Sequence, residues 1–363
     1  MKHKLDSLQA IRAYAACLVA ICHIWNDGVL PKIFVDLGQF GVDLFFVLSG
    51  FIMCLTARLD PGKKNANSIQ FLKKRIVRIF PIYLICSIPL LLFVTYAEGM
   101  KSPFFYIGNI LLLPSFMNDP SYRLALPPGW SLVYEMFFYY IFSLLLLVFV
   151  NKKQLIYFLI AILALLVSSI RLFGIQGPIL GWVNLTYMIG DTLLLNFALG
   201  CLSYIIYSSL KNKINFDLWQ SIALLLVLTF LTMALIHYKL PKFISNGIPA
   251  FIIIIIFLFT KNSSTQNHWL KKIVFVGDAS YSIYLTHFYF AFFKLKILSF
   301  IGQLIENRII LINLVDVVLL SMAIVFGCAF YYFLEKPIIY HFSKIIKRQT
   351  VKEYNESETL SVN

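Results

Sequence analysis

The chain has 363 residues, of which 60% are hydrophobic and only 13% are charged, and its formal net charge is +14. Soluble domains contain about 25% charged residues, so this composition excludes an ordinary soluble protein and predicts a polytopic membrane protein. The positive charge is no sign of nucleic-acid binding, because most Lys and Arg residues fall in loops on one predicted side of the membrane.

Runs of about 20 mostly apolar residues predict an all-α fold with ten transmembrane helices. The predicted spans are 7–26, 39–57, 76–97, 130–150, 154–172, 186–208, 218–237, 246–260, 278–298 and 311–334. The apolar segment 103–117 is interrupted by Gly108 and Pro114, and we interpret it as interfacial or re-entrant. Ten spans place the Lys- and Arg-rich loops and both termini on one side, which the positive-inside rule identifies as the cytoplasm.

The remaining composition signals indicate no metal chemistry. All six cysteines lie in predicted spans without metal-ligand spacing, and we interpret them as small buried residues. The sequence has no Gly-rich phosphate loop, HExxH motif or Cys/His cluster, so no metal cofactor is implied. We expect one transmembrane domain over 1–345 and a polar, disordered cytoplasmic tail over 346–363.

The first predicted span contains two ionisable residues, Arg12 and His23. They are eleven positions apart, so a helix brings both to one face, separated by roughly 16 Å along its axis. Ionisable groups inside a span are costly and commonly face a polar cavity, which makes both of them candidate functional residues. The alternatives are an Arg12 that extends to the inner headgroups and a His23 that packs at the interface.

Two carboxylates are expected at the depth of His23, near the outer face. Asp43 lies close to the outer end of the second span, and Glu135 lies about one turn into the fourth. A carboxylate beside an imidazole can hold it in one tautomer, so we predict that both orient His23 or the acceptor. Helix capping and an ion pair elsewhere are the alternatives for Asp43. Small residues interpreted as close-packing positions are Gly41, Ser49 and Gly50.

Arg75 and Arg78 lie at the cytoplasmic mouth of the third span, three residues apart on one helix face. Positive-inside anchoring explains the neighbouring lysines well. Two arginines at fixed spacing favour phosphate recognition, because guanidinium groups match phosphate oxygens in bidentate fashion. A cytoplasmic donor that carries phosphate, such as a coenzyme A thioester, would fit this pair.

Further polar residues occur at the ends of later spans. Trp130 is expected at the outer interface of the fourth span, with Ser131 and Tyr134 as hydrogen-bond donors to a substrate. In the ninth span Ser280, Tyr284 and His287 follow at spacings of four and three, which predicts one polar face. A bond from His287 to a neighbouring helix is the alternative reading for that residue. Glu335 ends the tenth span beside Lys336, where a local ion pair is as compatible with the sequence as catalysis.

At these residues the chain resembles the acyltransferase 3 family, integral membrane proteins that O-acylate carbohydrates outside the cytoplasmic membrane. The resemblance extends from residue 7 to residue 337 and rests on six motifs in the family's order. They are Arg12-x10-His23, GVDLFFVLSGFIM, KKRIVRIFPIY, GWSLVYEMFFY, SYSIYLTH and Glu335-x-Pro337. The fourth motif most resembles the branch that includes exopolysaccharide acetyltransferases.

The resemblance implies transfer of an acetyl group from cytoplasmic acetyl-CoA to a hydroxyl of a cell-surface or exported polysaccharide, or of its lipid-linked precursor. It implies that Arg12 and His23 are essential and that Arg75 and Arg78 support them. We expect His23 to act as general base or to carry the acetyl group transiently. The expected location is the bacterial cytoplasmic (inner) membrane, where the partners are the lipid bilayer, acyl-CoA, a glycan acceptor and the polysaccharide assembly machinery.

Two other classes of function fit the residues taken alone. A proton-coupled transporter or flippase of a glycan precursor also buries Arg, His, Asp and Glu near the midplane. It would move substrate in proteoliposomes without acetyl-CoA, and the lack of an inverted repeat counts against it. A non-catalytic partner in an assembly complex would keep acetylation unchanged after His23→Ala.

Overall fold

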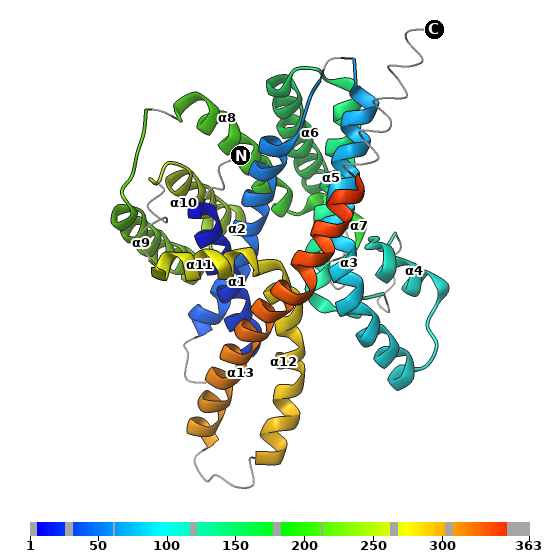
Figure 1. Cartoon of the computed structure of the whole chain (residues 1–363), viewed down its shortest axis with the longest axis vertical. Coiled ribbons are helices and arrows are strands. Elements are labelled where there is room, and N and C mark those ends of the chain that lie inside the picture. Colours follow the sequence, from blue (N-terminus) through cyan, green and yellow to red (C-terminus); the bar gives the residue numbers. More distant parts are fainter. Residues whose placement is uncertain are drawn as a thin grey trace.

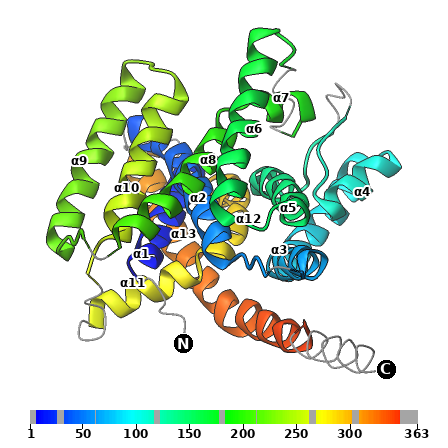
Figure 2. The same ribbon diagram turned by 90° about the horizontal axis from the view of Figure 1, so that it is seen from above.

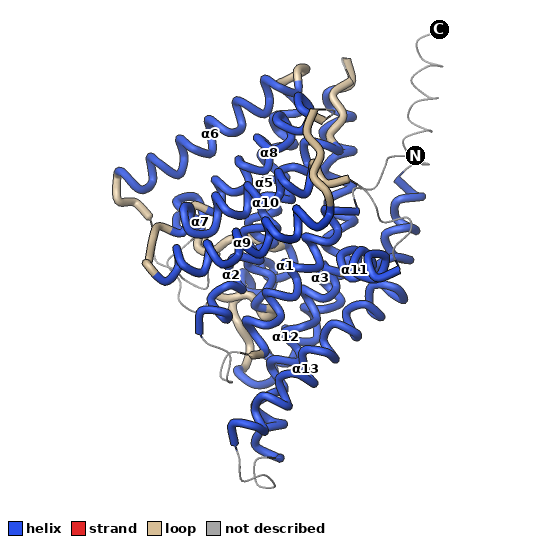
Figure 3. The backbone as a smooth tube through the Cα atoms, turned by 90° about the vertical axis from the view of Figure 1, so that its left-hand side faces the viewer, coloured by secondary structure: helices blue, strands red, loops and turns tan. Residues whose placement is uncertain are grey.

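The computed structural model describes residues 6–25, 32–60, 62–116, 122–176, 183–211, 213–261, 268–301 and 308–346. These residues form helices and loops, with two isolated backbone bridges and no strand among them (Figure 3). A helix satisfies its backbone hydrogen bonds internally, which is what a chain in lipid requires. The predicted all-α class is therefore confirmed, whereas the predicted tail over 346–363 lies outside the described residues except for Ile346.

The helices of the first half precede residue 173. They are α1 (Asp6–Ile24), α2 (Lys32–Thr56), α3 (Lys64–Glu98), α4 (Pro103–Leu111), the 3-10 turn η1 (Pro127–Gly129), α5 (Trp130–Val148) and α6 (Lys152–Leu172). The helices of the second half include two π-helical turns. They are α7 (Leu185–Gly190), α8 (Leu193–Leu210), α9 (Leu218–His237), η2 (Phe243–Gly247), α10 (Ile248–Leu258), α11 (His268–Asp278), α12 (Ser280–Ile301), α13 (Arg308–Phe330) and η3 (Tyr331–Glu335).

All ten predicted spans fall on helices, but not all of these helices match a membrane span equally well. In the described ranges, eight helices are long and apolar enough to cross a membrane. The predicted span 246–260 falls on a shorter apolar helix, Phe243–Leu258. The predicted span 278–298 falls on α12, which carries Lys294 and Lys296 and is not one of the eight.

One predicted span differs from the structure, and one predicted non-spanning segment agrees with it. The span 186–208 is divided at Asp191, which ends α7 and accepts a hydrogen bond from the Leu193 backbone at the start of α8, at 3.1 Å. The segment 103–117 contains α4, whose nine residues are too few to cross a bilayer. The interfacial or re-entrant reading of this segment is therefore favoured over an eleventh span.

The bundle is built around α1, which packs against α2, α11 and α12 (Figure 1). The hairpin of α12 and α13 extends beyond the other helices, at the end opposite the C-terminus (Figure 1). Seen from above, the continuation of α13 beyond Glu335 leaves the bundle at one side (Figure 2). The end of α1 and the α12–α13 hairpin are thus neighbours, which matters for the site described below.

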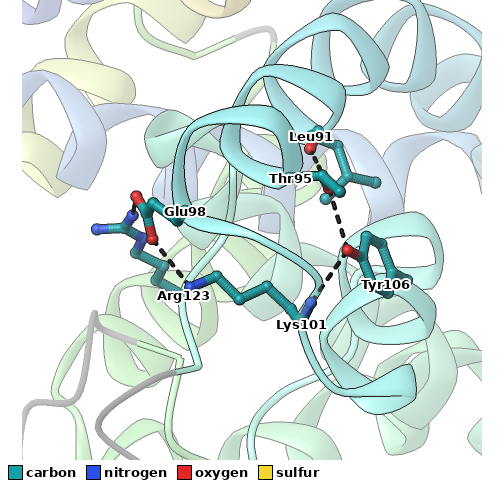
Figure 4. Close-up of polar contacts among 6 residues, drawn as sticks. All are labelled: Leu91, Thr95, Glu98, Lys101, Tyr106 and Arg123. Atoms are coloured by element: carbon teal, nitrogen blue, oxygen red, sulfur yellow. Dashed lines mark hydrogen bonds and ion pairs between the residues drawn. The ribbon is translucent and has the colours of Figure 1, made fainter.

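Polar contacts attach the segment between α3 and α5 to the end of α3 (Figure 4). The Glu98 carboxylate at the end of α3 accepts from Arg123 and lies 3.1 Å from the Lys101 ammonium. Beneath them the Asn109 side chain donates to the Arg123 carbonyl at 3.1 Å and accepts from the Ala125 backbone at 2.6 Å. These contacts hold residues 123–125, which directly precede η1, and so help to position the Pro128 carbonyl.

Glycines bring α2 and α8 into backbone contact. A Cβ at Gly200 would lie 2.0 Å from the Val47 carbonyl oxygen, and one at Gly50 would lie 2.3 Å from that of Phe197. Gly41 has the same role against α1, since a Cβ there would lie 2.7 Å from the Ala15 carbonyl oxygen. The prediction that Gly41 and Gly50 are close-packing positions is confirmed.

We therefore expect Gly200→Val to destabilise the protein by about 3 kcal/mol, the upper end of the usual range for overpacking, because the added methyl groups meet backbone rather than a mobile side chain. The measurement is the thermal unfolding of detergent-purified protein, with its size-exclusion profile. Ser209→Val, at an exposed position of the same helix, should leave both unchanged. Equal stability of the two variants would contradict the close contact.

Candidate active site

A cavity of about 90 Å³, called here the central cavity, lies between α1, α2, α3, α5, α8 and α12. Aromatic and aliphatic side chains form much of its wall. Its polar lining consists of Arg12, Ser49, Arg75, Arg78, Ser131, Glu135, Tyr139, Ser280, Tyr281 and Tyr284. Three arginines and a carboxylate from three different helices therefore meet inside an otherwise apolar bundle, which is the pattern of a site rather than of a core.

Glu135 is held by two hydroxyl groups in this cavity. Its Oε1 accepts a hydrogen bond from Ser49 at 2.9 Å and another from Tyr139. Glu135 does not contact His23 as predicted, because its carboxylate lies with the arginines of the cavity, whereas its predicted alternative role toward the acceptor stays a prediction. The reading of Ser49 as a packing residue is also corrected, since its hydroxyl is a hydrogen-bond donor to the site.

The Arg75 guanidinium is fixed by a hydroxyl group and two rings. Its Nη2 donates to the Thr56 hydroxyl at 2.5 Å. Its central carbon lies over the rings of Phe71 and Tyr139, 5.3 and 5.4 Å from their centroids. Such stacking suits the planar guanidinium and would not hold a lysine in the same way. The buried Arg75 is thus presented to the cavity in a fixed orientation, while Arg78 is half-buried.

A second cavity of about 440 Å³, called here the basic cavity, adjoins the first. Its charged lining comprises Arg58, Lys74, Arg75, Arg78, Asp278 and Glu335. Arg75 and Arg78 line both cavities, so the two spaces meet at this pair. The predicted common face of the two arginines is confirmed.

Glu335 points into the protein from the π-helical turn η3. Its Oε2 accepts a hydrogen bond from Ser282 at 2.5 Å, and only 5% of the residue is exposed. The ammonium of Lys336 lies elsewhere, 5.5 Å from the centroid of the Tyr332 ring. Of the two predicted readings, the local pair with Lys336 is not found, and Glu335 belongs to the wall of the basic cavity.

One face of α12 carries the polar contacts from the cavity toward the end of α1. Arg12 Nε donates to the Ser280 hydroxyl at 3.1 Å. The Tyr284 hydroxyl lies 2.7 Å from that of Ser131 and donates to the Pro128 carbonyl at 2.9 Å. The ring of His287 follows, with its centroid 6.0 Å from that of Tyr284. The predicted polar face of this helix is therefore confirmed, and it directs Ser131 into the site as well.

His23 and His287 form an imidazole pair beyond Tyr284. His287 Nε2 lies 3.2 Å from His23 Nδ1, and the ring centroids are 5.0 Å apart. His287 is fully buried, whereas His23 is exposed at the rim. The alternative reading of His287, a bond to a neighbouring helix, is thus the one observed, and its partner is the candidate catalytic histidine.

The backbone assigns the protons of this pair. His23 Nδ1 lies 2.9 Å from the Val19 carbonyl oxygen, and His287 Nδ1 lies 3.2 Å from that of Ile283. A carbonyl oxygen only accepts, so both Nδ1 atoms carry hydrogen and both Nε2 atoms are bare. The single hydrogen on His23 Nδ1 is then shared between the Val19 carbonyl oxygen and His287 Nε2, and His23 Nε2 is left with a free lone pair. The arrangement can take up a proton at His23 Nε2 and stabilise the resulting imidazolium.

Asp43 lies in a separate polar cluster. Its carboxylate accepts hydrogen bonds from the Asn196 and Asn246 side chains, the latter at 3.0 Å. The prediction that Asp43 orients His23 is wrong, and His287 occupies that place instead. Asn196 and Asn246 were missed, although polar residues inside apolar spans could have indicated them by the rule that indicated Asp43.

Two predicted substrate contacts also lie outside the cavity lining. The Tyr134 hydroxyl donates to Asp191 Oδ2 at 3.1 Å, so it joins α5 to the break between α7 and α8. The half-buried Trp130 packs edge-on against the Tyr134 ring, at a centroid distance of 5.6 Å. Tyr139 and Tyr281, which the sequence reading did not single out, line the cavity instead.

Comparison with known proteins was made on the whole sequence. A family model described as "Acyltransferase domain" matches residues 5–333. The O-acetyltransferase OatA of Staphylococcus aureus is 25% identical over 315 residues, which cover 78% of this chain and 50% of that protein. The acyltransferase MdmB of Streptomyces mycarofaciens is 28% identical over 155 residues, which cover 39% of each chain. The chain thus spans about half the length of the first of these relatives. No solved structure matches the chain.

Proposed function

The chain belongs to the acyltransferase 3 family, and on this premise we propose that it is a multi-pass O-acetyltransferase of the bacterial cytoplasmic membrane. The donor is acetyl-CoA, and the acceptor is a hydroxyl of a cell-surface or exported polysaccharide or of its lipid-linked precursor. One observation carries the proposal: two cavities that share Arg75 and Arg78 are followed along α12 by an imidazole pair with a bare, exposed nitrogen.

The basic cavity suits the nucleotide end of the donor. Coenzyme A carries a pyrophosphate and a ribose phosphate, and arginine forks match such groups in bidentate fashion. Arg58, Lys74 and the shared Arg78 supply positive charge there, on the side that the loop charges predict to be cytoplasmic. The largely apolar central cavity then lies on the path of the pantetheine arm, which passes Arg12 and Arg75. The arm extends along the polar face of α12, so that the thioester reaches His23, roughly 16 Å farther along α1 than Arg12.

His23 supplies the base. Its Nε2 takes the proton of the acceptor hydroxyl, the oxygen attacks the thioester carbonyl carbon, the carbon–sulfur bond breaks, and the imidazolium protonates the departing thiolate. His287 holds the ring through Nδ1 during both proton transfers. In the relay variant, His23 Nε2 itself attacks the thioester carbonyl carbon, the carbon–sulfur bond breaks and the thiolate leaves. The acceptor hydroxyl oxygen then attacks the acetyl carbon, the carbon–nitrogen bond breaks, and the hydroxyl proton passes through the freed Nε2 to the thiolate. A trapped acetyl-histidine in a stalled variant distinguishes the relay from direct transfer.

The test is NMR of surface glycans purified from wild-type, deletion and His23→Ala cells. We expect an O-acetyl signal in the wild type that disappears in both other strains and returns with a plasmid-borne wild-type gene. Purified protein should transfer label from acetyl-CoA to the glycan that lost the signal. An unchanged O-acetyl signal in His23→Ala cells would overturn the catalytic role, and glycan translocation independent of acetyl-CoA would identify a transporter instead.

A further inference from the structure

The last turn of α1, which carries His23, packs against both helices of the α12–α13 hairpin. The Ile24 side chain is fully buried in an apolar cluster formed with α13, whose buried members are Leu311, Val315, Leu319 and Ala323. The Trp25 indole Nε1 donates to the Asn313 side-chain oxygen at 2.9 Å. The hairpin extends beyond the rest of the bundle (Figure 1). Its helix α13 contacts α1 at Ile24 and Trp25, next to His23.

A buried ion pair joins α12 to α13 where the hairpin contacts α1. Lys294 Nζ is 2.6 Å from Asp316 Oδ1, and the two side chains are only 4% and 0% exposed. The same ammonium donates to the Ile24 carbonyl oxygen at 2.7 Å. The last carbonyls of a helix have no partner within that helix, and a lysine ammonium there also complements the helix dipole. Lys294 therefore joins α13 to the C-terminal end of α1.

The register of α12 connects this pair to the active site. His287 and Lys294 are seven residues apart, about 20° from the same direction on a helix, so one face of α12 carries both. That face meets two successive residues of α1, His23 through its ring and Ile24 through its carbonyl. A shift of the last turn of α1 relative to α12 would therefore break both contacts together.

We propose that Lys294 and Asp316 are positioning residues that hold the His23 imidazole against His287. A contribution to stability does not explain why an ion pair is buried here, because replacing a buried ion pair by apolar side chains is often neutral or stabilising. The Ile24 contact supplies the reason, since an apolar side chain cannot donate to that carbonyl. The proposal rests on the proposed acetyl transfer for its kinetic test, but not for its chemical one.

The kinetic test uses the double variant Lys294→Met/Asp316→Leu, which removes both charges and keeps the volume. We expect kcat for acetyl transfer to fall about tenfold or more, because misplacing a catalytic group by about 1 Å can cost 10²-fold. The KM for acetyl-CoA should stay within about twofold, since the donor cavities are remote. The thermal midpoint should stay equal or rise, as expected when a buried pair becomes apolar. Lys296→Met, an exposed lysine on the same helix, is the matched control and should change nothing.

A second variant separates positioning from folding. Lys294→Asp/Asp316→Lys keeps an ion pair but removes the ammonium from the Ile24 carbonyl, so kcat should fall as in the apolar variant. The chemical test follows carbethoxylation of His23 by mass spectrometry, with the exposed His341 as internal reference. Its rate should rise at least about threefold when the ring is released from His287. Wild-type kcat and an unchanged His23 rate in either folded double variant would overturn the proposal, whereas a wild-type protein without transferase activity would refute the proposed function alone.

Discussion

His23→Ala should lower kcat for acetyl transfer by about 10³-fold or more while the protein remains folded. General base catalysis contributes about 10²- to 10⁴-fold, and the relay route would lose its nucleophile as well. Initial rates with labelled acetyl-CoA and purified glycan measure the effect. The control is His341→Ala, which removes an exposed histidine that lines neither cavity and should keep wild-type rates. A folded His23→Ala variant within about threefold of wild type would contradict the assigned base.

The companion substitutions at His287 examine how the base is held. His287→Leu removes the acceptor for His23 Nδ1 and should cost about 10²-fold in kcat, within the range for loss of a group that orients a base. A glutamine oxygen can lie near the position of the imidazole Nε2, so His287→Gln should retain several times more activity than His287→Leu. Equal losses would show that packing, rather than the hydrogen bond at Nε2, is what His287 supplies.

Arg78→Gln should raise the KM for acetyl-CoA about 10- to 100-fold. A hydrogen bond to a charged group is worth about 1.5–3 kcal/mol, and each 1.4 kcal/mol is tenfold in affinity. Arg78 lines both cavities and is half-buried, so it is placed to meet donor phosphate. Arg78→Lys keeps the charge but loses the fork and should show an intermediate KM. Steady-state kinetics over a range of acetyl-CoA concentrations provide the measurement.

The matched control is Lys73→Gln, which removes the same charge from an exposed position five residues earlier on α3. Positive-inside anchoring would treat the two side chains alike, because both lie near the same end of the helix. Phosphate recognition distinguishes them, since Lys73 is not among the residues that line either cavity. An equal rise in KM for the two variants would therefore favour anchoring over donor binding.

Much of the fold was predictable because lipid leaves few alternatives for a chain of this composition. Apolar runs of span length must form helices, and all ten predicted spans fall on helices. Spacing along one helix was equally informative. Arg12 and His23 do share a face, since both contact α12, and Ser280, Tyr284 and His287 do form one polar face of that helix.

The partners of these residues required the tertiary structure. Hydropathy and loop charge give the depth of a residue, because each position along a helix adds 1.5 Å, but they do not give its direction around the bundle. Asp43 and His23 were expected at one depth, yet Asp43 faces the asparagines of α8 and η2. Glu135 was likewise assigned to His23 and belongs with Arg75 and Arg78.

The sequence by itself thus determined the helical class through its composition, and the family and the residue types of the site through its motifs, because both kinds of signal can be read along a single chain. Only the tertiary structure showed that His287 contacts His23 and that two cavities meet at Arg75 and Arg78. It alone also showed that the α12–α13 hairpin packs against the end of α1. The physical reason is that lateral packing depends on side-chain fit between distant segments, such as Gly200 against Val47. No single helix carries that information in its own pattern.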